Sequence, residues 1–170
     1  TTRSLLVEIT KDWQLLNLLT REESRQLLSK EVANNRREPP TKTQWPTTQE
    51  PEVVAAGDGS ADRKSGRAAA GYAIWRSAAI HDIADPTIPT EDPLIISGIR
   101  TIGAPTPNRS ELLAILGILK ACRTATKLTV LSDSNYAYTV LEKRLRGGST
   151  PENTANRDII EAIHSEVKRR

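Results

Sequence analysis

Short apolar runs separated by turn residues start at residue 53, and their order allows few folds. The runs at 53–56, 68–75 and 94–102 are predicted strands, because each has the length and the bounding turn residues of a strand. A long apolar helix follows at 109–119, and the continuous apolar run at 128–131 is typical of an interior parallel strand. With the helix as a crossover between parallel strands, this order predicts an α/β fold, a mixed sheet with flanking helices.

The start of the helix at 109–119 is predicted from its capping residues. Asn108 is a common N-cap residue, and Glu111 stands three residues later, as in a capping box. We therefore expect the helix to begin at Asn108, with Glu111 in its first turn. Two further helices are predicted, at 136–145 and from residue 156 onward.

The first part of the chain has a different character. Residues 1–36 contain two predicted helices, one over 4–19 with apolar residues at spacings of three and four, and one that starts at a capping box on Thr20. The apolar residues of the first helix are Leu5, Leu6, Ile9, Trp13 and Leu16. Several prolines among Thr, Gln and Glu predict a linker over 37–52. We expect a small helical segment and a linker before a domain over 53–170.

Composition excludes some classes of protein and leaves others open. The net charge is +3, although 24 Lys and Arg residues leave room for a local basic face that contacts phosphate. The single cysteine, Cys122, cannot form an internal disulfide, and no Cys/His cluster has zinc-site spacing. No apolar run is long enough for a membrane span, and no targeting signal is visible. We expect an intracellular protein of unknown compartment, without membrane contact.

Three acids stand at positions from which they can converge. Asp58 lies in a predicted Gly-Asp-Gly turn after the first strand, Glu111 lies at the start of the apolar helix, and Asp133 follows the run at 128–131. If the first and fourth strands are parallel neighbours, Asp58 and Asp133 emerge at the same edge of the sheet. Converging carboxylates repel one another unless a divalent cation neutralises them, and Mg²⁺ is the natural occupant. Taken singly, each acid is also explained as a turn or helix-start residue.

Three stretches of sequence around these acids resemble the ribonuclease H family in wording, order and spacing. Residues 53–60, VVAAGDGS, together with AGYA at 70–73, are similar to the family's first two strands and its Asp-Gly-Ser turn. PNRSELLA at 107–114 resembles its Asn-Arg-x-Glu-Leu helix start, and TVLSDSNY at 129–136 resembles its fourth strand. The resemblance extends over 53–167 and is strongest to the domains attached to reverse transcriptases of retroelements.

The resemblance implies a ribonuclease H-like fold that hydrolyses the RNA strand of an RNA–DNA hybrid with two Mg²⁺ ions, or with Mn²⁺ as a substitute. It implies that Asp58 bridges both ions, while Glu111 and Asp133 complete the ion at the leaving 3′ oxygen. The side chains expected to contact the nucleic acid are Ser60, Thr106, Asn108, Arg109 and Ser134. Because specificity would come from the sugars across the minor groove, base sequence is expected to matter little.

One part of the family pattern lies beyond the sequence given. In the family, a further strand and a histidine-containing loop lead to a helix that bears a fourth carboxylate, and the sequence given stops at Arg170. Neither Asp158 nor His164 is expected to replace the missing groups, because both lie on a helix that the family does not use in catalysis. We therefore expect a C-terminally incomplete domain from a retroelement reverse transcriptase polyprotein.

Two functions follow from these observations. The first is a metal-dependent endonuclease for RNA–DNA hybrids, and the alternative is a catalytically inactive module that serves as a scaffold or binding part of a ribonucleoprotein assembly. A transposase or integrase core is a third class, disfavoured because those cores place their acids differently. The nuclease hypothesis predicts that basic side chains gather near the acids, namely Arg63, Lys64, Arg67 and Arg109. A scaffold would hold its partner elsewhere, for example through Trp13, Trp45 or the first helices.

Overall fold

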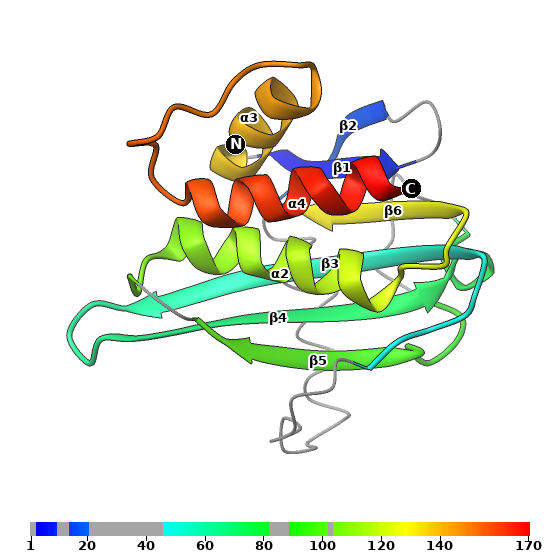
Figure 1. Cartoon of the computed structure of the whole chain (residues 1–170). Coiled ribbons are helices and arrows are strands. Elements are labelled where there is room, and N and C mark those ends of the chain that lie inside the picture. The colour runs from blue at the N-terminus through cyan, green and yellow to red at the C-terminus, as the bar shows by residue number, and fades with distance from the viewer. Residues whose placement is uncertain (1–2, 10–13, 21–45, 82–88, 102–103) are drawn as a thin grey trace.

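The computed structural model describes residues 3–9, 14–20, 46–81, 89–101 and 104–170. These residues form a six-stranded mixed sheet with three α-helices and one 3₁₀ turn (Figure 1). The strands are β1 (Arg3–Ile9), β2 (Gln14–Thr20), β3 (Glu52–Asp62), β4 (Arg67–Arg76), β5 (Ile95–Arg100) and β6 (Lys127–Ser132). The helices are α2 (Pro107–Ala121), α3 (Asn135–Leu145) and α4 (Arg157–Arg169), and η1 is Ser77–Ala79.

The sheet has the strand order β2-β1-β6-β3-β4-β5. β3 and β6 are parallel, with Glu52–Ala56 in register with Lys127–Leu131, and every other pair in the sheet is antiparallel. Helix α2 is part of the crossover that joins these two parallel strands, as the order of apolar runs predicts. The predicted α/β fold is therefore confirmed, and the parallel pairing brings Asp58 and Asp133 to the same end of the sheet.

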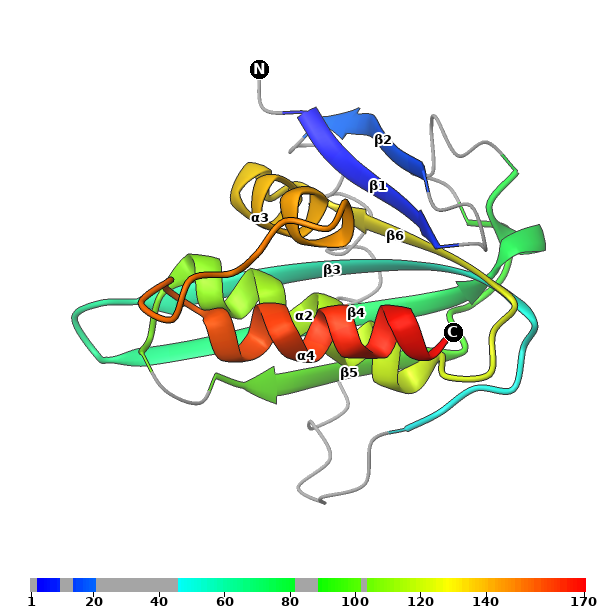
Figure 2. The same ribbon diagram turned by 45° about the horizontal axis from the view of Figure 1, so that its top comes forward.

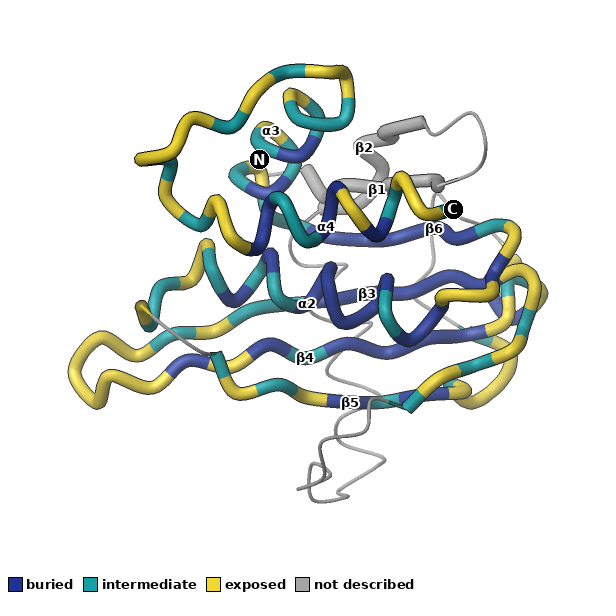
Figure 3. Tube along the Cα trace, viewed as in Figure 1, coloured by how far each residue is buried: buried dark blue, intermediate teal, exposed yellow. Residues whose placement is uncertain are grey.

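The main core lies on one face of the sheet, where helix α2 packs on the strands and helix α4 packs on α2 (Figure 2). Alternate residues of the central strands point into it, including Val53 and Ala55 of β3 and Leu128 and Val130 of β6. Most of α2 is buried between the sheet and α4 (Figure 3). This double burial explains why the sequence of α2 is apolar on most sides.

The opposite face of the sheet is apolar as well. Val54, Ala56, Ala73, Trp75 and Leu131 form a second buried cluster with η1 and the residue that follows it. β3 and β6 are thus covered on both faces, which explains the continuous apolar runs of these two strands. In the described part of the chain, no helix combines the length and the apolar character that a membrane crossing requires.

The helix predicted over residues 4–19 is wrong. The described residues there form β1 and β2, which pair antiparallel, and β1 also pairs with β6 from Leu5 opposite Ser132 to Ile9 opposite Leu128. Short apolar runs fit a strand as well as a buried helix, and spacing alone does not separate the two. The edge of β6 decides between them, because it offers a row of backbone groups that only a strand can pair.

The structure tests only a small part of the other predictions for residues 1–52. The second predicted helix begins at Thr20, which ends β2, and its remainder lies outside the described residues. Residues 46–50 form neither helix nor strand, and β3 begins at Glu52. The division into a segment at 1–36, a linker at 37–52 and a domain at 53–170 stays a prediction.

Candidate active site

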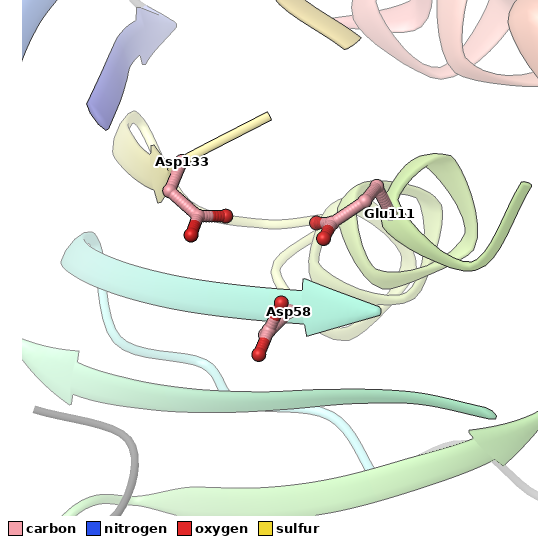
Figure 4. A group of neighbouring side chains, drawn as sticks. All are labelled: Asp58, Glu111 and Asp133. Carbon is pink, nitrogen blue, oxygen red and sulfur yellow. The ribbon is translucent and has the colours of Figure 1, made fainter. Parts of the chain in front are cut away.

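The three acids singled out in the sequence come together in the fold. Asp58, Glu111 and Asp133 each offer a carboxylate oxygen, and these oxygens all lie within 4.8 Å of one another. Figure 4 shows the carboxyl groups of Glu111 and Asp133 directed toward each other beside β3, which carries Asp58. All three residues are half-buried. The cluster is therefore partly shielded from water and still accessible from one side.

Asp58 lies inside β3 and not in a turn, which corrects the predicted Gly-Asp-Gly turn. β3 continues without a break to Asp62, and Asp58 pairs with Gly71 of β4. The strand loses its β6 neighbour after Ala56, so that the edge at Asp58 is open. The Asp58 side chain accepts a hydrogen bond from the backbone N–H of Gly59, with a distance of 2.9 Å.

The two glycines beside Asp58 allow α2 to approach β3. A Cβ atom added at Gly59 would lie 2.4 Å from the backbone nitrogen of Glu111, and one added at Gly57 would lie 3.0 Å from the Cβ of Ala114. Glycine is required here for close backbone approach and not for a turn. The sequence signal was visible, but glycines beside an aspartate are also typical of turns.

Helix α2 begins two residues earlier than predicted. Its N-cap is Thr106, whose hydroxyl accepts a hydrogen bond from the backbone N–H of Arg109 at 3.2 Å, and Pro107 is the first helical residue. Proline is favoured at this position because it lacks the N–H that a helix start leaves unpaired. Asn108 is therefore not the cap, and Glu111 lies in the second turn and not in a capping box.

The start of α2 is fixed on the sheet through a buried hydroxyl. Ser110 is fully buried, and its Oγ lies 2.9 Å from the hydroxyl of Thr101. The same Oγ lies within hydrogen-bond distance of the carbonyl oxygens of Ser60, at 3.3 Å, and Thr106, at 3.2 Å. These contacts hold the residue next to Glu111 against β3 and the loop after β5, so that the position of Glu111 is set by the sheet.

The electrostatics of the site are dominated by Glu111. Burial raises the pKa of Glu111 to about 9, with further contributions from a hydrogen bond with Asp58 and from the charges of Asp58 and Asp133. Its Oε2 atom is buried and has no hydrogen-bond partner among the described residues. An unpartnered oxygen in a group of carboxylates is the environment that a hard divalent cation satisfies, because the cation neutralises the charges and ligates the oxygen. The residues present therefore fit a metal ion.

The comparison with protein families agrees with this geometry. A family model described as RNase H matches residues 49–170, which is more than half of the chain. The chain belongs to the RNase H family. A search of curated proteins returned no match. The family resemblance and the fold that it implies are thus confirmed for the RNase H domain of this chain.

The predicted nucleic-acid contacts of the RNase H domain lie around the acids. Ser60 and Asn108 are exposed, on β3 and at the second position of α2. The hydroxyl of Thr106 caps α2, and that of Ser134 caps α3 by accepting a hydrogen bond from the N–H of Ala137 at 3.1 Å. The role of these four residues in binding stays a prediction.

Arg109 makes internal contacts that the sequence did not indicate. Its guanidinium group donates to both carboxylate oxygens of Asp158, at 2.9 and 2.6 Å, and to Oδ1 of Asn156 at 3.4 Å. The Asn156 side chain in turn donates to the hydroxyl of Tyr136 at 3.1 Å. The pair joins the start of α4 to the first turn of α2, which precedes the turn that carries Glu111. No local pattern predicts it, because the two partners are 49 residues apart.

We expect the Asp158→Asn substitution to weaken Mn²⁺ binding by up to about tenfold, as changes behind a metal ligand do, and to lower the free energy of unfolding by about 1 kcal/mol. The pair is partly screened because the Asp158 side chain is 63% exposed. Calorimetric titration with Mn²⁺ and thermal unfolding measure the two effects.

A matched control is available on the same helix. Arg144 of α3 and Glu161 of α4 form a similar two-pronged pair, with distances of 2.8 and 3.0 Å, that does not involve α2. Glu161→Gln should cost similar stability and leave Mn²⁺ affinity unchanged. Equal loss of affinity in both variants would show that the Arg109–Asp158 pair acts only through global stability.

Proposed function

We propose that this chain is a metal-dependent endonuclease domain that hydrolyses the RNA strand of RNA–DNA hybrids. Its catalytic and metal-binding residues are Asp58, Glu111 and Asp133. The observation that carries the proposal is the convergence of three carboxylate oxygens within 4.8 Å. One of the three residues, Glu111, also has a buried oxygen without a hydrogen-bond partner among the described residues. Membership of the RNase H family supports the hybrid as the substrate. The ion that fits an all-oxygen ligand set of this kind is Mg²⁺, with Mn²⁺ as a substitute.

The side chains have separate tasks in this mechanism. Bound Mg²⁺ supplies the positive charge that stabilises the attacked phosphate and the leaving oxygen. Glu111 must lose the proton that burial holds on it before it can serve as a ligand. Asp58 is oriented by the N–H of Gly59, which donates to its Oδ1 on the open edge of β3. The rigid strand and helix carry the acids, which keeps their spacing constant during the reaction.

The same proposal assigns the substrate contacts. Ser60, Thr106, Asn108 and Ser134 each lie within five residues of one of the acids in the chain and offer short polar side chains, which suit hydrogen bonds to phosphate and sugar oxygens. Arg109 is assigned to this group more weakly, because Asp158 occupies its guanidinium group. Contacts to the sugar hydroxyls would distinguish RNA from DNA without reading base sequence.

A second candidate is a non-catalytic RNase H module that binds RNA or protein in a ribonucleoprotein assembly. One observation favours it: among the described residues, the candidate metal group contains three acids and no fourth. Asp158 does not supply a fourth ligand, because its carboxylate is bound to Arg109. The nuclease is favoured overall, since three carboxylates held together destabilise a fold that has no cation to bind. We further propose that the domain is part of a retroelement reverse transcriptase polyprotein.

The test is cleavage of a hybrid with labelled RNA strand in Mg²⁺ and in Mn²⁺, with single-stranded RNA and RNA duplex of the same sequence for comparison. We expect cleavage of the RNA strand in the hybrid alone. Asp58→Asn is the control, because cleavage that it removes comes from this site and not from a contaminant. The assay is repeated with a chain extended past Arg170. Hybrid binding without cleavage by either folded chain would support the non-catalytic module.

A further inference from the structure

The β3–β4 ribbon extends past the strands on both of its sides. β3 pairs with β6 only up to Ala56. On the other side, β4 pairs with β5 only from Ala69 onward. The ribbon nevertheless continues until Asp62 faces Arg67, and its end projects from the sheet in Figures 1 and 2. A two-stranded ribbon alone is only marginally stable in water. Contacts with α2 and with the loop after β5 reach only Ser60 and Ala68, so that the Asp62–Arg67 pair and the turn beyond it lie outside the printed contacts of these neighbours.

The end of this ribbon carries three cations: Arg63, Lys64 and Arg67. All three are exposed, and none forms an ion pair with a described residue. Elsewhere in the described chain most arginines are paired; those paired with acids are Arg76, Arg109, Arg123, Arg144, Arg146 and Arg169. Three like charges on a projecting ribbon repel one another, so that folding alone gives no reason to gather them.

The one acid at the ribbon end, Asp62, is used to hold the turn. Its carboxylate accepts a hydrogen bond from the N–H of Lys64 at 2.9 Å, and hydrogen bonds with Ser65 and Lys64 lower its pKa. Gly66 follows with a φ of 66°, which the turn requires. Asp62 thus orders the loop that presents the cations and forms no ion pair with them among the described contacts.

The cations lie in line with the acidic site. Arg63 directly follows β3 and is five residues beyond Asp58, which corresponds to at most roughly 17 Å of extended chain. Side chains alternate along a strand, so Asp58 and Asp62, four residues apart, lie on the same face of β3. Arg67 of β4 is directly opposite Asp62. Arg67 is therefore on the face of the ribbon that bears Asp58. A chain of phosphates that passes Asp58 along this face reaches Arg67 and the turn.

We propose that Arg63, Lys64 and Arg67, here called the basic ribbon, bind the sugar-phosphate backbone of the duplex whose scissile phosphate lies at the acidic site. The inference rests on the proposed function, since it takes the same hybrid as the ligand. The contact lies about five nucleotides from the cut bond, because successive phosphates of one strand are roughly 3.4 Å apart along the axis. Ala61, Ser65 and Ala68 beside the cations offer no aromatic rings on which bases could stack, so that the contact of the ribbon with the hybrid is assigned to charge.

The experiment is equilibrium binding of a fluorescent RNA–DNA hybrid, measured by anisotropy over a range of KCl concentrations, on the Asp58→Asn background so that no cleavage occurs. The triple variant Arg63→Ala, Lys64→Ala, Arg67→Ala should bind more weakly at low salt. Its slope of log affinity against log salt should be shallower by up to about 2.7, from three phosphates at about 0.9 each. Lys64→Ala alone should make the slope shallower by about 0.9.

The matched control is Lys168→Ala, because Lys168 is exposed on α4, away from the ribbon, and should leave the slope unchanged. Conversion of Arg63 and Arg67 to Lys should keep the slope, and thermal unfolding checks that the Ala variants fold. With hybrids cut back to fewer than about five base pairs on the ribbon side, the triple variant and its parent should bind alike.

An unchanged salt slope in a folded triple variant would overturn the basic ribbon, whether or not the chain cleaves. Absence of cleavage by the chain with Asp58 restored, together with a slope that depends on the ribbon, would instead reject the nuclease and keep the binding surface. Failure of the parent to bind the hybrid at low salt would reject both.

Discussion

The Gly59→Ala substitution is expected to reduce hybrid cleavage about a hundredfold and to lower the free energy of unfolding by about 2 kcal/mol. The added Cβ would lie 2.4 Å from the backbone nitrogen of Glu111 and 2.5 Å from the carbonyl carbon of Ser110. Both are backbone atoms, so that the clash cannot be relieved by a change of rotamer. The start of α2 has to move away from β3, and Glu111 moves with it.

The control for this substitution is Gly71→Ala. Gly71 is the register partner of Asp58 on β4, and a Cβ there has its nearest neighbour at 3.9 Å, an ordinary contact. We expect this variant to retain cleavage and Mn²⁺ binding. Mn²⁺ affinity by calorimetry and unfolding by urea are measured for both variants. If Gly59→Ala kept full metal affinity and cleavage, the close packing of α2 on β3 would not set the position of Glu111.

For Glu111 we expect the metal-free protein to lose about 1.4 kcal/mol of stability for each pH unit between about pH 5 and pH 9. The pKa of this carboxyl is raised from 4.5 to about 9, mainly by burial. The unfolded chain releases the proton near pH 4.5, whereas the folded chain retains it. The folded state therefore binds more protons in this window, and its stability falls as pH rises through it. Glu111→Gln should remove this slope, which urea unfolding at several pH values measures.

The same proton couples metal binding to pH. Because a cation must displace it, Mn²⁺ affinity should rise about tenfold per pH unit below pH 9, with release of about one proton. Titration calorimetry in two buffers of different ionisation enthalpy counts that proton. Glu161→Gln is the control, since the pKa of Glu161 is lowered to about 2 by Arg144 and its carboxyl is already charged. Metal binding at pH 7 without proton release would show that Glu111 is ionised in the free protein.

The sequence predicted most of what depends on local pattern. The apolar run of β6 and the apolar helix α2 are long enough to be recognised, and both owe their composition to burial on two sides. The convergence of Asp58, Glu111 and Asp133 was also predictable, because the ends of parallel strands meet at one edge of a sheet. The resemblance to the RNase H family added the expected chemistry to these positions.

Other features depend on which segments meet in space, and the local sequence leaves them open. The apolar spacing over residues 4–19 fits a helix, but in the structure Leu5–Ile9 pair with the edge of β6 as strand β1. Gly57 and Gly59 are typical of a turn, and only the approach of α2 reveals why glycine is needed there. Arg109 was expected to face the nucleic acid, and its pairing with Asp158 depends on α4 packing beside α2.

The type and order of the elements from residue 53 onward and the convergence of the three acids could be predicted from the sequence, since both follow from apolar periodicity and strand direction. The tertiary structure was needed to show that the first residues form β1 and β2, that Arg109 pairs with Asp158, and that α2 packs closely on Gly59. All three are contacts between segments that are far apart in the chain: backbone pairing at a sheet edge, an ion pair between two helices, and the close approach of a helix to a strand. Such contacts cannot be predicted from a local stretch of sequence, because that stretch does not specify which other segment will pack against it.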